Sequence, residues 1–343
     1  MAAELANFEG YVNRVIPFKT VDGLELSLDV LYPSTKPSSP RPVVIHYHGG
    51  FLVIGDRYAF FPSWLAQACV SRGWIFVTPD YRLIPEVTAH ASVEDAVDAY
   101  QWVLKSLSSH IGIELGPVVL AGSSAGGFLA LTTSVTVTPK PAALVSIYGM
   151  LDMANERYLT KGSNIFGLPV FDTTKIKQSL TELKQPVLSA YPYPADPSSD
   201  PRMAIIATLH IDALFPDYMT GISGLTEKVI NEGVEAIPAS HRSLYPLTFG
   251  DVGDLPPTVV VHGRNDSAVP AALSEVAVEK LRTAGVSVHS EFPDVGEHGF
   301  DRVAGRKLEQ ETTGELAAPS FQSLRNTLKT LEQMVAKAAA RPS

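Results

Sequence analysis

Short runs of β-branched and apolar residues alternate with stretches of helical periodicity along much of the chain. Two alternating stretches, Tyr11 to Thr20 and Gly23 to Tyr32, flank the turn signal Val21-Asp22-Gly23 and predict an antiparallel hairpin. After a loop rich in Pro and Ser, four short apolar runs are each followed by a helical stretch. They are Val43 to Tyr47, Trp74 to Thr78, Val118 to Ala121 and Ala143 to Ile147. This alternation predicts βαβ crossovers and an α/β fold with a mostly parallel central sheet, covered by helices on both faces.

The alternation stops at Gly149 and resumes near Gly253. The segment between them is irregular, with Pro-rich patches, scattered aromatic residues and helical fragments near Asp172 to Leu183 and Met203 to Leu214. The elements expected after it are a strand at Pro257 to His262, a helix at Pro270 to Ala284, a strand at Val286 to Phe292 and a helix at Pro319 to Ala340. We therefore predict one core made of residues 1–148 and 254–343, with residues 149–253 inserted as a cap or lid.

Composition narrows the class of protein. The 343 residues carry 27 Lys and Arg against 36 Asp and Glu, a formal net charge of −9, which argues against a nucleic-acid binder. The N-terminal residues lack a signal-peptide pattern, and no run approaches the roughly 18 apolar residues of a membrane span. The single cysteine, Cys69, lies in a helix-like apolar stretch and is expected to be a buried, inert thiol. We expect a cytoplasmic protein with a small-molecule substrate and no cofactor. The sequence leaves the oligomeric state open, a homodimer included.

A serine stands between a predicted strand and a predicted helix. The strand Val118 to Ala121 runs into Gly122-Ser123-Ser124-Ala125-Gly126, and a helix follows, so the pattern G-x-S-x-G has the strand–turn–helix context of a nucleophile elbow. In such a sharp turn, side chains two residues before and after the serine would collide with the neighbouring strand and helix, and glycine avoids this collision. The pattern therefore predicts Ser124 as a nucleophile at the carboxyl edge of the sheet.

A second glycine-containing loop follows the strand at Val43. There, His48-Gly49-Gly50-Phe51 leaves the sheet with little side-chain bulk, so that backbone N–H groups can turn toward an anion. Together with the amide of Ala125, Gly49 and Gly50 are the predicted oxyanion hole. His46 and His48 also have the i, i+2 spacing of some zinc sites, but no further cluster of ligands accompanies them, so we expect no metal.

A serine hydroxyl needs a base, and the base needs an orienting acid. Asp266 follows the strand at Pro257, and His298 follows the next strand, flanked by glycine, which gives the order Ser, Asp, His along the chain. Two other acids, Asp294 and Glu297, share a loop with His298 and are poorly placed to hold its ring. His262 is an alternative base, but it precedes the acid and closes a strand.

These motifs, in this order and spacing, resemble the α/β-hydrolase fold, and in particular its hormone-sensitive-lipase-like carboxylesterase branch. The resemblance covers about Val43 to the C-terminus except the insertion. It rests on His48-Gly49-Gly50-Phe51, Asp80 to Glu86, Gly122 to Gly127, Asp266 with Val269-Pro270, and His298-Gly299-Phe300. It implies a catalytic triad of Ser124, Asp266 and His298, and an oxyanion hole of Gly49, Gly50 and Ala125.

The sequence departs from that family pattern at two positions. Phe51 replaces the usual third loop glycine, as in arylformamidase-like relatives with a His-Gly-Gly-aromatic loop, and Ser123 replaces the Asp that commonly precedes the nucleophile. Within the segment carried over as architecture, Arg82 and Glu86 are expected to be partners of an internal ion pair.

The expected substrate is an uncharged, mostly apolar acyl or aromatic compound. The insertion and the oxyanion loop are rich in aromatic side chains, and Phe51, Ser123, Tyr218 and Val269 are the predicted pocket residues. The aromatic residues named for the pocket are Phe51, Phe60, Phe61, Phe166, Phe171, Tyr191, Tyr193, Phe215 and Tyr218. We thus predict a serine hydrolase that acts on an ester or a related acyl bond. Two alternatives stay open, a lyase or cyclase without a covalent intermediate and a non-catalytic ligand receptor.

Overall fold

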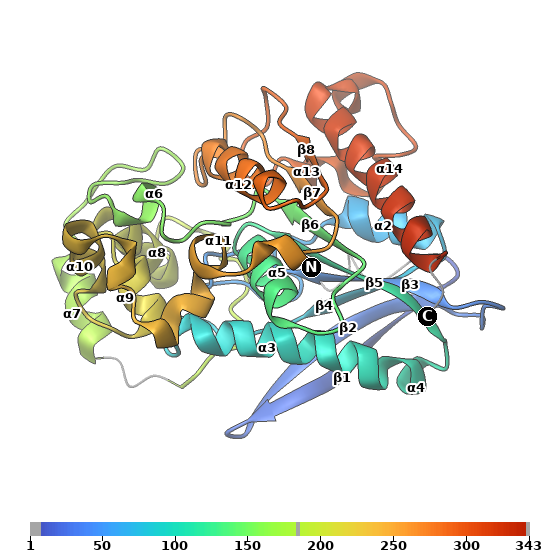
Figure 1. Ribbon diagram of the computed structural model, residues 1–343, viewed down its shortest axis with the longest axis horizontal. Coiled ribbons are helices and arrows are strands. Elements are labelled where there is room, and N and C mark those ends of the chain that lie inside the picture. The colour runs from blue at the N-terminus through green and yellow to red at the C-terminus, as the bar shows by residue number, and fades with distance from the viewer. Residues whose placement is uncertain (1–7, 183–185, 341–343) are drawn as a thin grey trace.

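The computed structural model describes residues 8–182 and 186–340, and an eight-stranded sheet forms its centre (Figure 1). The strand order is β1-β2-β4-β3-β5-β6-β7-β8. The pairs β1–β2 and β2–β4 are antiparallel and all later neighbours are parallel, as predicted. The strands are β1 (Tyr11–Val21), β2 (Leu24–Pro33), β3 (Arg41–Tyr47), β4 (Ile75–Pro79), β5 (Leu115–Ser123), β6 (Ala143–Ile147), β7 (Thr258–Val261) and β8 (Val288–Glu291).

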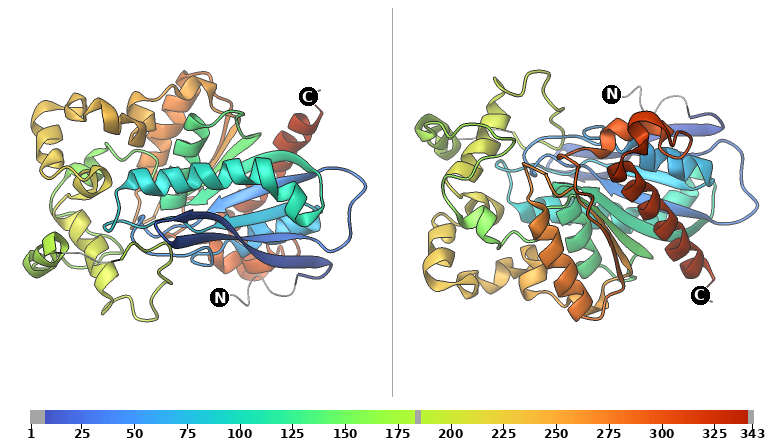
Figure 2. Two further views of the ribbon diagram at one scale, coloured as in Figure 1. Left: turned by 90° about the horizontal axis from the view of Figure 1, so that it is seen from below. Right: turned by 90° about the horizontal axis from the view of Figure 1, so that it is seen from above.

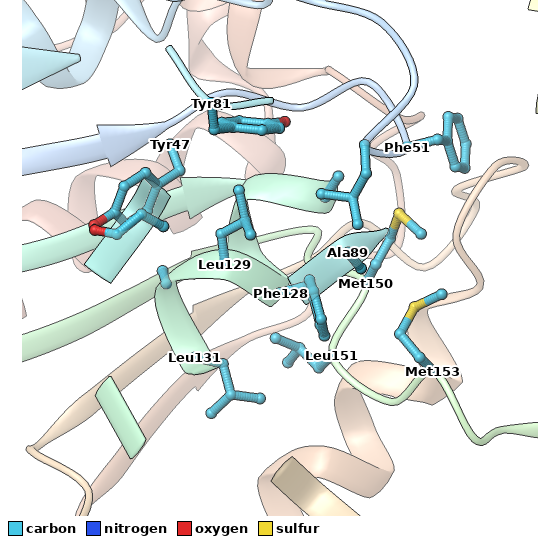
Figure 3. Packing of buried hydrophobic residues seen from close by; sticks show 14 of the residues in the cluster. Tyr47, Phe51, Tyr81, Ala89, Phe128, Leu129, Leu131, Met150, Leu151 and Met153 are labelled. Atoms are coloured by element: carbon cyan, nitrogen blue, oxygen red, sulfur yellow. The ribbon is translucent and has the colours of Figure 1, made fainter. Parts of the chain in front are cut away.

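Helices cover both faces of this sheet because its central strands are apolar on both sides. Val44 belongs to one buried cluster, whereas its neighbours Val43 and Ile45 belong to the other, as the two-residue period of a strand requires. The cluster with Val44 contains α2 (Ser63–Ser71) and α14 (Pro319–Ala339). The opposite cluster contains α3 (Ala89–Trp102), α5 (Ala125–Thr136) and α12 (Ala271–Thr283). Figure 3 shows part of the second cluster, where side chains of α5 and of the segment after β6 meet.

The segment between β6 and β7 is built from helices, and none of its described residues adds a strand to the sheet. Figures 1 and 2 show most of these helices gathered at one end of the sheet, far from α14. They are α6 (Glu156–Leu159), α7 (Thr174–Glu182), α8 (Pro201–Ile211), α9 (Phe215–Thr220), α10 (Leu225–Glu232) and α11 (Pro246–Phe249). Helices α7 and α8 match the two predicted fragments, although Leu183 lies outside the described residues.

A buried ion pair ties this insertion to the core, and it corrects one expectation. Arg202 of α8 pairs with Glu86 at 2.7 Å between Nη1 and Oε1, with both side chains at most 6% exposed. Arg82, the expected partner of Glu86, instead binds Asp95 and Glu94, at 2.8 Å each. The expectation of an Arg82–Glu86 pair was wrong because Arg82 faces α3, whereas Glu86 faces the insertion.

Other expectations have simpler outcomes. The strand expected at Val286 to Phe292 is shorter, since β8 covers only Val288–Glu291. Cys69 is buried on α2, and burial raises the pKa of its thiol well above the ordinary value. Among the helices of residues 8–182 and 186–340, none combines the length and apolar character needed to cross a membrane. The first and last residues, on which the expected cytoplasmic location partly rested, lie outside the described part.

Candidate active site

Ser124 occupies the strained turn between β5 and α5. Its backbone φ of 54° and ψ of −120° lie in a region that non-glycine residues rarely adopt. The two flanking glycines are needed for space: a Cβ atom at Gly122 would lie 2.0 Å from the Gly126 carbonyl oxygen, and one at Gly126 would lie 1.9 Å from that of Tyr47. The predicted reason for the G-x-S-x-G spacing therefore holds in the structure.

The side chains of Ser124, His298 and Asp266 form a chain of hydrogen bonds. Ser124 Oγ lies 3.0 Å from His298 Nε2, and His298 Nδ1 lies 2.7 Å from Asp266 Oδ2. Because a carboxylate only accepts, Nδ1 carries the hydrogen, which leaves Nε2 free to accept the serine proton. Three groups that are up to 174 residues apart in sequence thus meet at one rim of the sheet.

Asp266 is surrounded by donors. Its Oδ1 accepts from the backbone N–H groups of Ala268, at 2.9 Å, and Val269, at 2.8 Å. Burial raises the pKa of Asp266, but the hydrogen bonds from His262 and His298 outweigh burial, so that the pKa lies well below its ordinary value. The carboxylate is therefore ionised at neutral pH and can stabilise a positively charged His298.

The alternative base and acids have other partners. His262 is fully buried, donates from Nε2 to Asp266 Oδ2 at 3.2 Å and to the Val269 carbonyl at 2.8 Å, and accepts from Ser274 at Nδ1. It thus holds the acid from behind. Asp294 is 95% exposed beside Arg264. Glu297 accepts from the backbone N–H of His298, at 2.7 Å, rather than from its ring.

The predicted oxyanion loop lies against Ser124. A Cβ atom at Gly49 would be 3.1 Å from Ser124 Cβ, which shows how closely the two backbones approach. Gly50 has a φ of 117°, and its carbonyl accepts from the N–H groups of Val53 and Ile54. Within residues 8–182 and 186–340, the N–H groups of Gly49, Gly50 and Ala125 have no acceptor, so they are available to an anion.

The two histidines before this loop have structural partners. His46 Nε2 lies 2.9 Å from Ser123 Oγ, and His48 Nδ1 lies 2.7 Å from the Gly49 carbonyl oxygen. Burial lowers the pKa of His46 to about 3 and that of His48 to about 4, so both rings are neutral near pH 7. Over the described part of the chain, no three His, Cys, Asp or Glu side chains are arranged to hold a metal ion.

A small pocket opens beside Ser124. Its volume is about 20 Å³, which is space for about one water molecule. Of the predicted pocket residues, Phe51 and Ser123 line it, whereas Tyr218 and Val269 do not. Tyr218 lies on α9 within the insertion, and Val269 lies behind Asp266, where its backbone holds Asp266 and His262. The pocket is lined by Gly49, Gly50, Phe51, Ile54, Phe60, Ser123, Ser124, Tyr148, Phe166, Tyr193, Met203, His298 and Gly299.

Sequence reasoning missed a group that supports the His298 ring. The Tyr148 ring lies 4.7 Å from that of His298, between centroids, and its hydroxyl donates to Asp301 Oδ1. Trp64 Nε1 donates to the other oxygen of the same carboxylate, at 2.8 Å. Burial raises the pKa of Asp301. One signal was available: Tyr148 directly follows β6 at the carboxyl edge of the sheet, the kind of position that identified Asp266 and His298.

Comparison with known proteins supports the observed fold. Residues 44–217 match a family described as alpha/beta hydrolase fold. A protein named probable carboxylesterase from a Phoma species is 27% identical over 314 residues, covering 86% of this chain and 92% of that protein. A solved bacterial heroin esterase is similar in fold, with a TM-score of 0.64 and 23% identity over 97% of this chain and 88% of that one.

Much longer proteins also match. A non-reducing polyketide synthase from Preussia isomera is 26% identical over 298 residues, which covers 81% of this chain but 13% of the synthase. The chain thus spans only a small part of the polyketide synthases that it matches.

Proposed function

Since the chain belongs to the α/β-hydrolase fold family, we propose that it is a serine hydrolase that cleaves a carboxylic ester or a related acyl bond. The observation that carries this proposal is the chain of hydrogen bonds from Ser124 through His298 to Asp266, with 3.0 Å and 2.7 Å between heavy atoms. This is the arrangement that activates a hydroxyl nucleophile. The similarity to a probable carboxylesterase supports the same reaction class.

In the proposed mechanism, His298 takes the proton of Ser124 while Oγ attacks the acyl carbon. The carbonyl oxygen becomes an oxyanion, which accepts hydrogen bonds from the free amides of the oxyanion loop and of Ala125. Collapse of this intermediate expels the alcohol, which receives the proton from His298, and leaves an acyl group on Ser124. A water molecule, deprotonated by His298, then attacks the acyl-enzyme and releases the carboxylic acid. Asp266 keeps the imidazole tautomer correct and stabilises the imidazolium.

The proposed substrate is a mostly apolar small molecule. Aromatic and aliphatic side chains from the oxyanion loop and the insertion surround the pocket, namely Phe51, Ile54, Phe60, Phe166, Tyr193 and Met203. Because this pocket has a volume of only about 20 Å³, productive binding requires side chains around it to move, and we assign that role to the oxyanion loop and to residues 149–253 acting as a lid. The similarity to polyketide synthases favours a polyketide-like acyl group.

That similarity also supports a second candidate reaction, cyclisation or elimination on the same scaffold without an acyl-enzyme. Hydrolysis and this second reaction would both use the oxyanion hole, but only hydrolysis would pass through an acyl group on Ser124. A receptor without turnover is disfavoured because the base is present and hydrogen-bonded to the nucleophile.

A fluorophosphonate probe followed by peptide mass mapping tests the proposal. We expect covalent labelling of Ser124 in the wild type and none in Ser124→Ala, together with turnover of simple nitrophenyl esters. Absence of labelling, with ester turnover unchanged in Ser124→Ala, would show that the nucleophile is wrong. Turnover of a metabolite without any acyl adduct at Ser124 would favour the cyclase or lyase.

A further inference from the structure

Phe51 separates the catalytic pocket from a second buried group of side chains. Its ring lies 6.4 Å from that of His298 on one side and 5.0 Å from that of His210 on the other, between centroids. Figure 3 shows Phe51 at the margin of the core cluster. The residue has a φ of 57°, in the left-handed region that phenylalanine rarely adopts. The ring thus lies between His298 in the pocket and His210 behind it.

Behind this ring lie two polar atoms without partners. His210 Nδ1 lies 2.9 Å from the Ile206 carbonyl oxygen, so Nδ1 carries the hydrogen and Nε2 is a bare acceptor. His210 Nε2 and the Tyr158 hydroxyl are both buried, and neither has a hydrogen-bond partner among the described residues. Their rings are 6.2 Å apart. A buried polar atom without a partner destabilises the fold, so a ligand group that pairs with these two atoms would be bound favourably.

Helix α8 connects these atoms with the catalytic pocket. Met203 of α8 lines the pocket, and His210 follows seven residues later on the same face of the helix. The distance along the helix axis is roughly 10 Å. A substrate that displaces Phe51 would therefore extend along α8 from Ser124 toward His210.

We propose that Phe51 is a gate, and that behind it His210 and Tyr158 form a subsite for a hydroxyl group of the substrate. The inference rests on the proposed esterase function. A hydroxyl donates to His210 Nε2 and accepts from the Tyr158 hydroxyl, so one group satisfies both buried atoms. The subsite selects an ester with an apolar body and a hydroxyl at its far end.

The charges around the subsite favour an uncharged hydroxyl over a carboxylate. Burial raises the pKa of Tyr158 above its ordinary value, and the carboxylates of Asp266 and Asp152 act in the same direction, whereas Arg157 opposes them. A substrate carboxylate would add a further negative charge close to Asp266 and Asp152 in a buried site, at a cost that burial increases.

Matched ester pairs test the subsite. The pairs are nitrophenyl phenylpropanoate with its para-hydroxyphenyl analogue, and phenylethyl acetate with its para-hydroxyphenyl analogue, so that the hydroxyl is on the acyl side in one pair and on the alcohol side in the other. In at least one pair we expect the wild type to prefer the hydroxylated ester by about tenfold in kcat/KM, the effect of one buried hydrogen bond. Tyr158→Phe and His210→Phe should reduce this preference to about twofold or less.

Tyr245→Phe is the matched control. Like the Tyr158 hydroxyl, the Tyr245 hydroxyl is buried and has no partner among the described residues, and Tyr245 does not line the pocket. This variant should keep the tenfold preference. The subsite is overturned if the wild type shows no preference in either pair, if Tyr158→Phe lowers both members of a pair equally, or if Tyr245→Phe has the same effect.

The gate is tested with Phe51→Leu, which replaces the ring with a smaller side chain. We expect kcat/KM for nitrophenyl phenylpropanoate to rise at least about threefold relative to nitrophenyl acetate, because only the larger acyl group needs the space. An equal change for both esters would overturn the gate.

A binding measurement separates failure of this subsite from failure of the esterase proposal. Hydroxyphenylethanol should raise the Tm of the wild type more than phenylethanol, and Tyr158→Phe should abolish the difference. If no ester is turned over and Ser124 is not labelled, the esterase proposal fails, and this difference in Tm still decides the subsite. Equal shifts with the two alcohols would overturn it.

Discussion

The two sides of the candidate active site differ in how fully their polar atoms are satisfied. On the side of the sheet, Ser124, His298 and Asp266 are joined by hydrogen bonds, and backbone amides hold the acid. On the side of the insertion, Tyr158 and His210 carry buried polar atoms that lack partners in the described residues. Large apolar side chains there are also exposed, namely Phe166, Leu168, Val170 and Phe171.

This difference suggests that the two sides have separate functions. The groups on the sheet side follow strands that are paired in register, so they cannot shift without breaking the ladder. The helices of the insertion join the core through side-chain packing and ion pairs, such as the buried pair between Arg202 and Glu86, and not through a strand of the sheet. We infer that the sheet side determines the reaction and the insertion side determines the substrate. The predictions below test the two sides separately.

The largest expected effect is on the nucleophile. Ser124→Ala should lower kcat by a factor on the order of 10⁴–10⁶, because removal of Oγ abolishes the covalent route. The measurement is steady-state hydrolysis of a nitrophenyl ester, with Ser109→Ala, an exposed serine on α4 (Ser108–Ile111), as the matched control. Retention of wild-type turnover by Ser124→Ala would disprove the triad.

The orienting acid should come next. Asp266→Asn is expected to lower kcat by about 10³–10⁴, because the amide favours the wrong imidazole tautomer and cannot stabilise imidazolium. Asp294→Asn is the control, since that carboxylate is on the His298 loop but 95% exposed. A similar fall of kcat in both variants would mean that activity depends on the charge of the His298 loop and not on Asp266 as the orienting acid.

The elbow should be intolerant of added bulk. In Gly126→Ala, the new Cβ would lie 1.9 Å from the Tyr47 carbonyl oxygen, so β3 and α5 would have to separate. We expect the free energy of unfolding to fall by about 3 kcal/mol or more, in the range of severe core substitutions, as measured by urea denaturation. Gly162→Ala on the insertion has open space around its Cβ but a φ of 82°, and should cost less. If both variants lose the same free energy of unfolding, the close approach of Gly126 to Tyr47 does not explain the need for glycine at this position.

A smaller effect is expected at the support beneath His298. Tyr148→Phe keeps the ring that lines the pocket but removes the hydrogen bond to Asp301. We expect kcat to fall about threefold to thirtyfold while KM stays nearly constant, because the substrate contact remains and only the orientation of the imidazole is loosened. A rise in KM with unchanged kcat would instead place Tyr148 in substrate binding alone.

The smallest effect is a pair of opposite pH dependences. The folded pKa of Asp266 is lowered, so its stabilisation is present above its unfolded pKa of about 4 and is lost as pH falls through the folded pKa. The pKa of Asp301 is raised by burial, so its stabilising effect is greatest below about pH 4 and declines as pH rises through the folded pKa. We would measure the free energy of unfolding with urea from pH 3 to 7. Relative to the wild type, Asp266→Asn should lose less of this free energy as the pH falls, and Asp301→Asn should lose less of it as the pH rises toward neutral. Identical slopes in both variants would contradict these assignments.

Much of the sheet and of the candidate active site could be predicted because their signals are local. A buried parallel strand is a short apolar run, and the elbow is a glycine spacing in one stretch of chain, so Ser124 and its strand follow directly from the amino-acid sequence. The Arg82–Glu86 expectation failed because both residues lie in one segment but face different elements. Tyr218 could not be placed either, since its position depends on how α9 packs within the insertion.

The sequence by itself determined the order of strands and helices, the turn that presents Ser124, and the order Ser, Asp, His, because each depends on neighbouring residues or on chain order. Only the tertiary structure decided that Tyr148, Asp301 and Trp64 meet beneath His298, and that His210 and Tyr158 lie behind Phe51. The physical reason is that periodicity shows which face of an element is buried, whereas the partner buried against that face is set by packing between segments far apart in the chain.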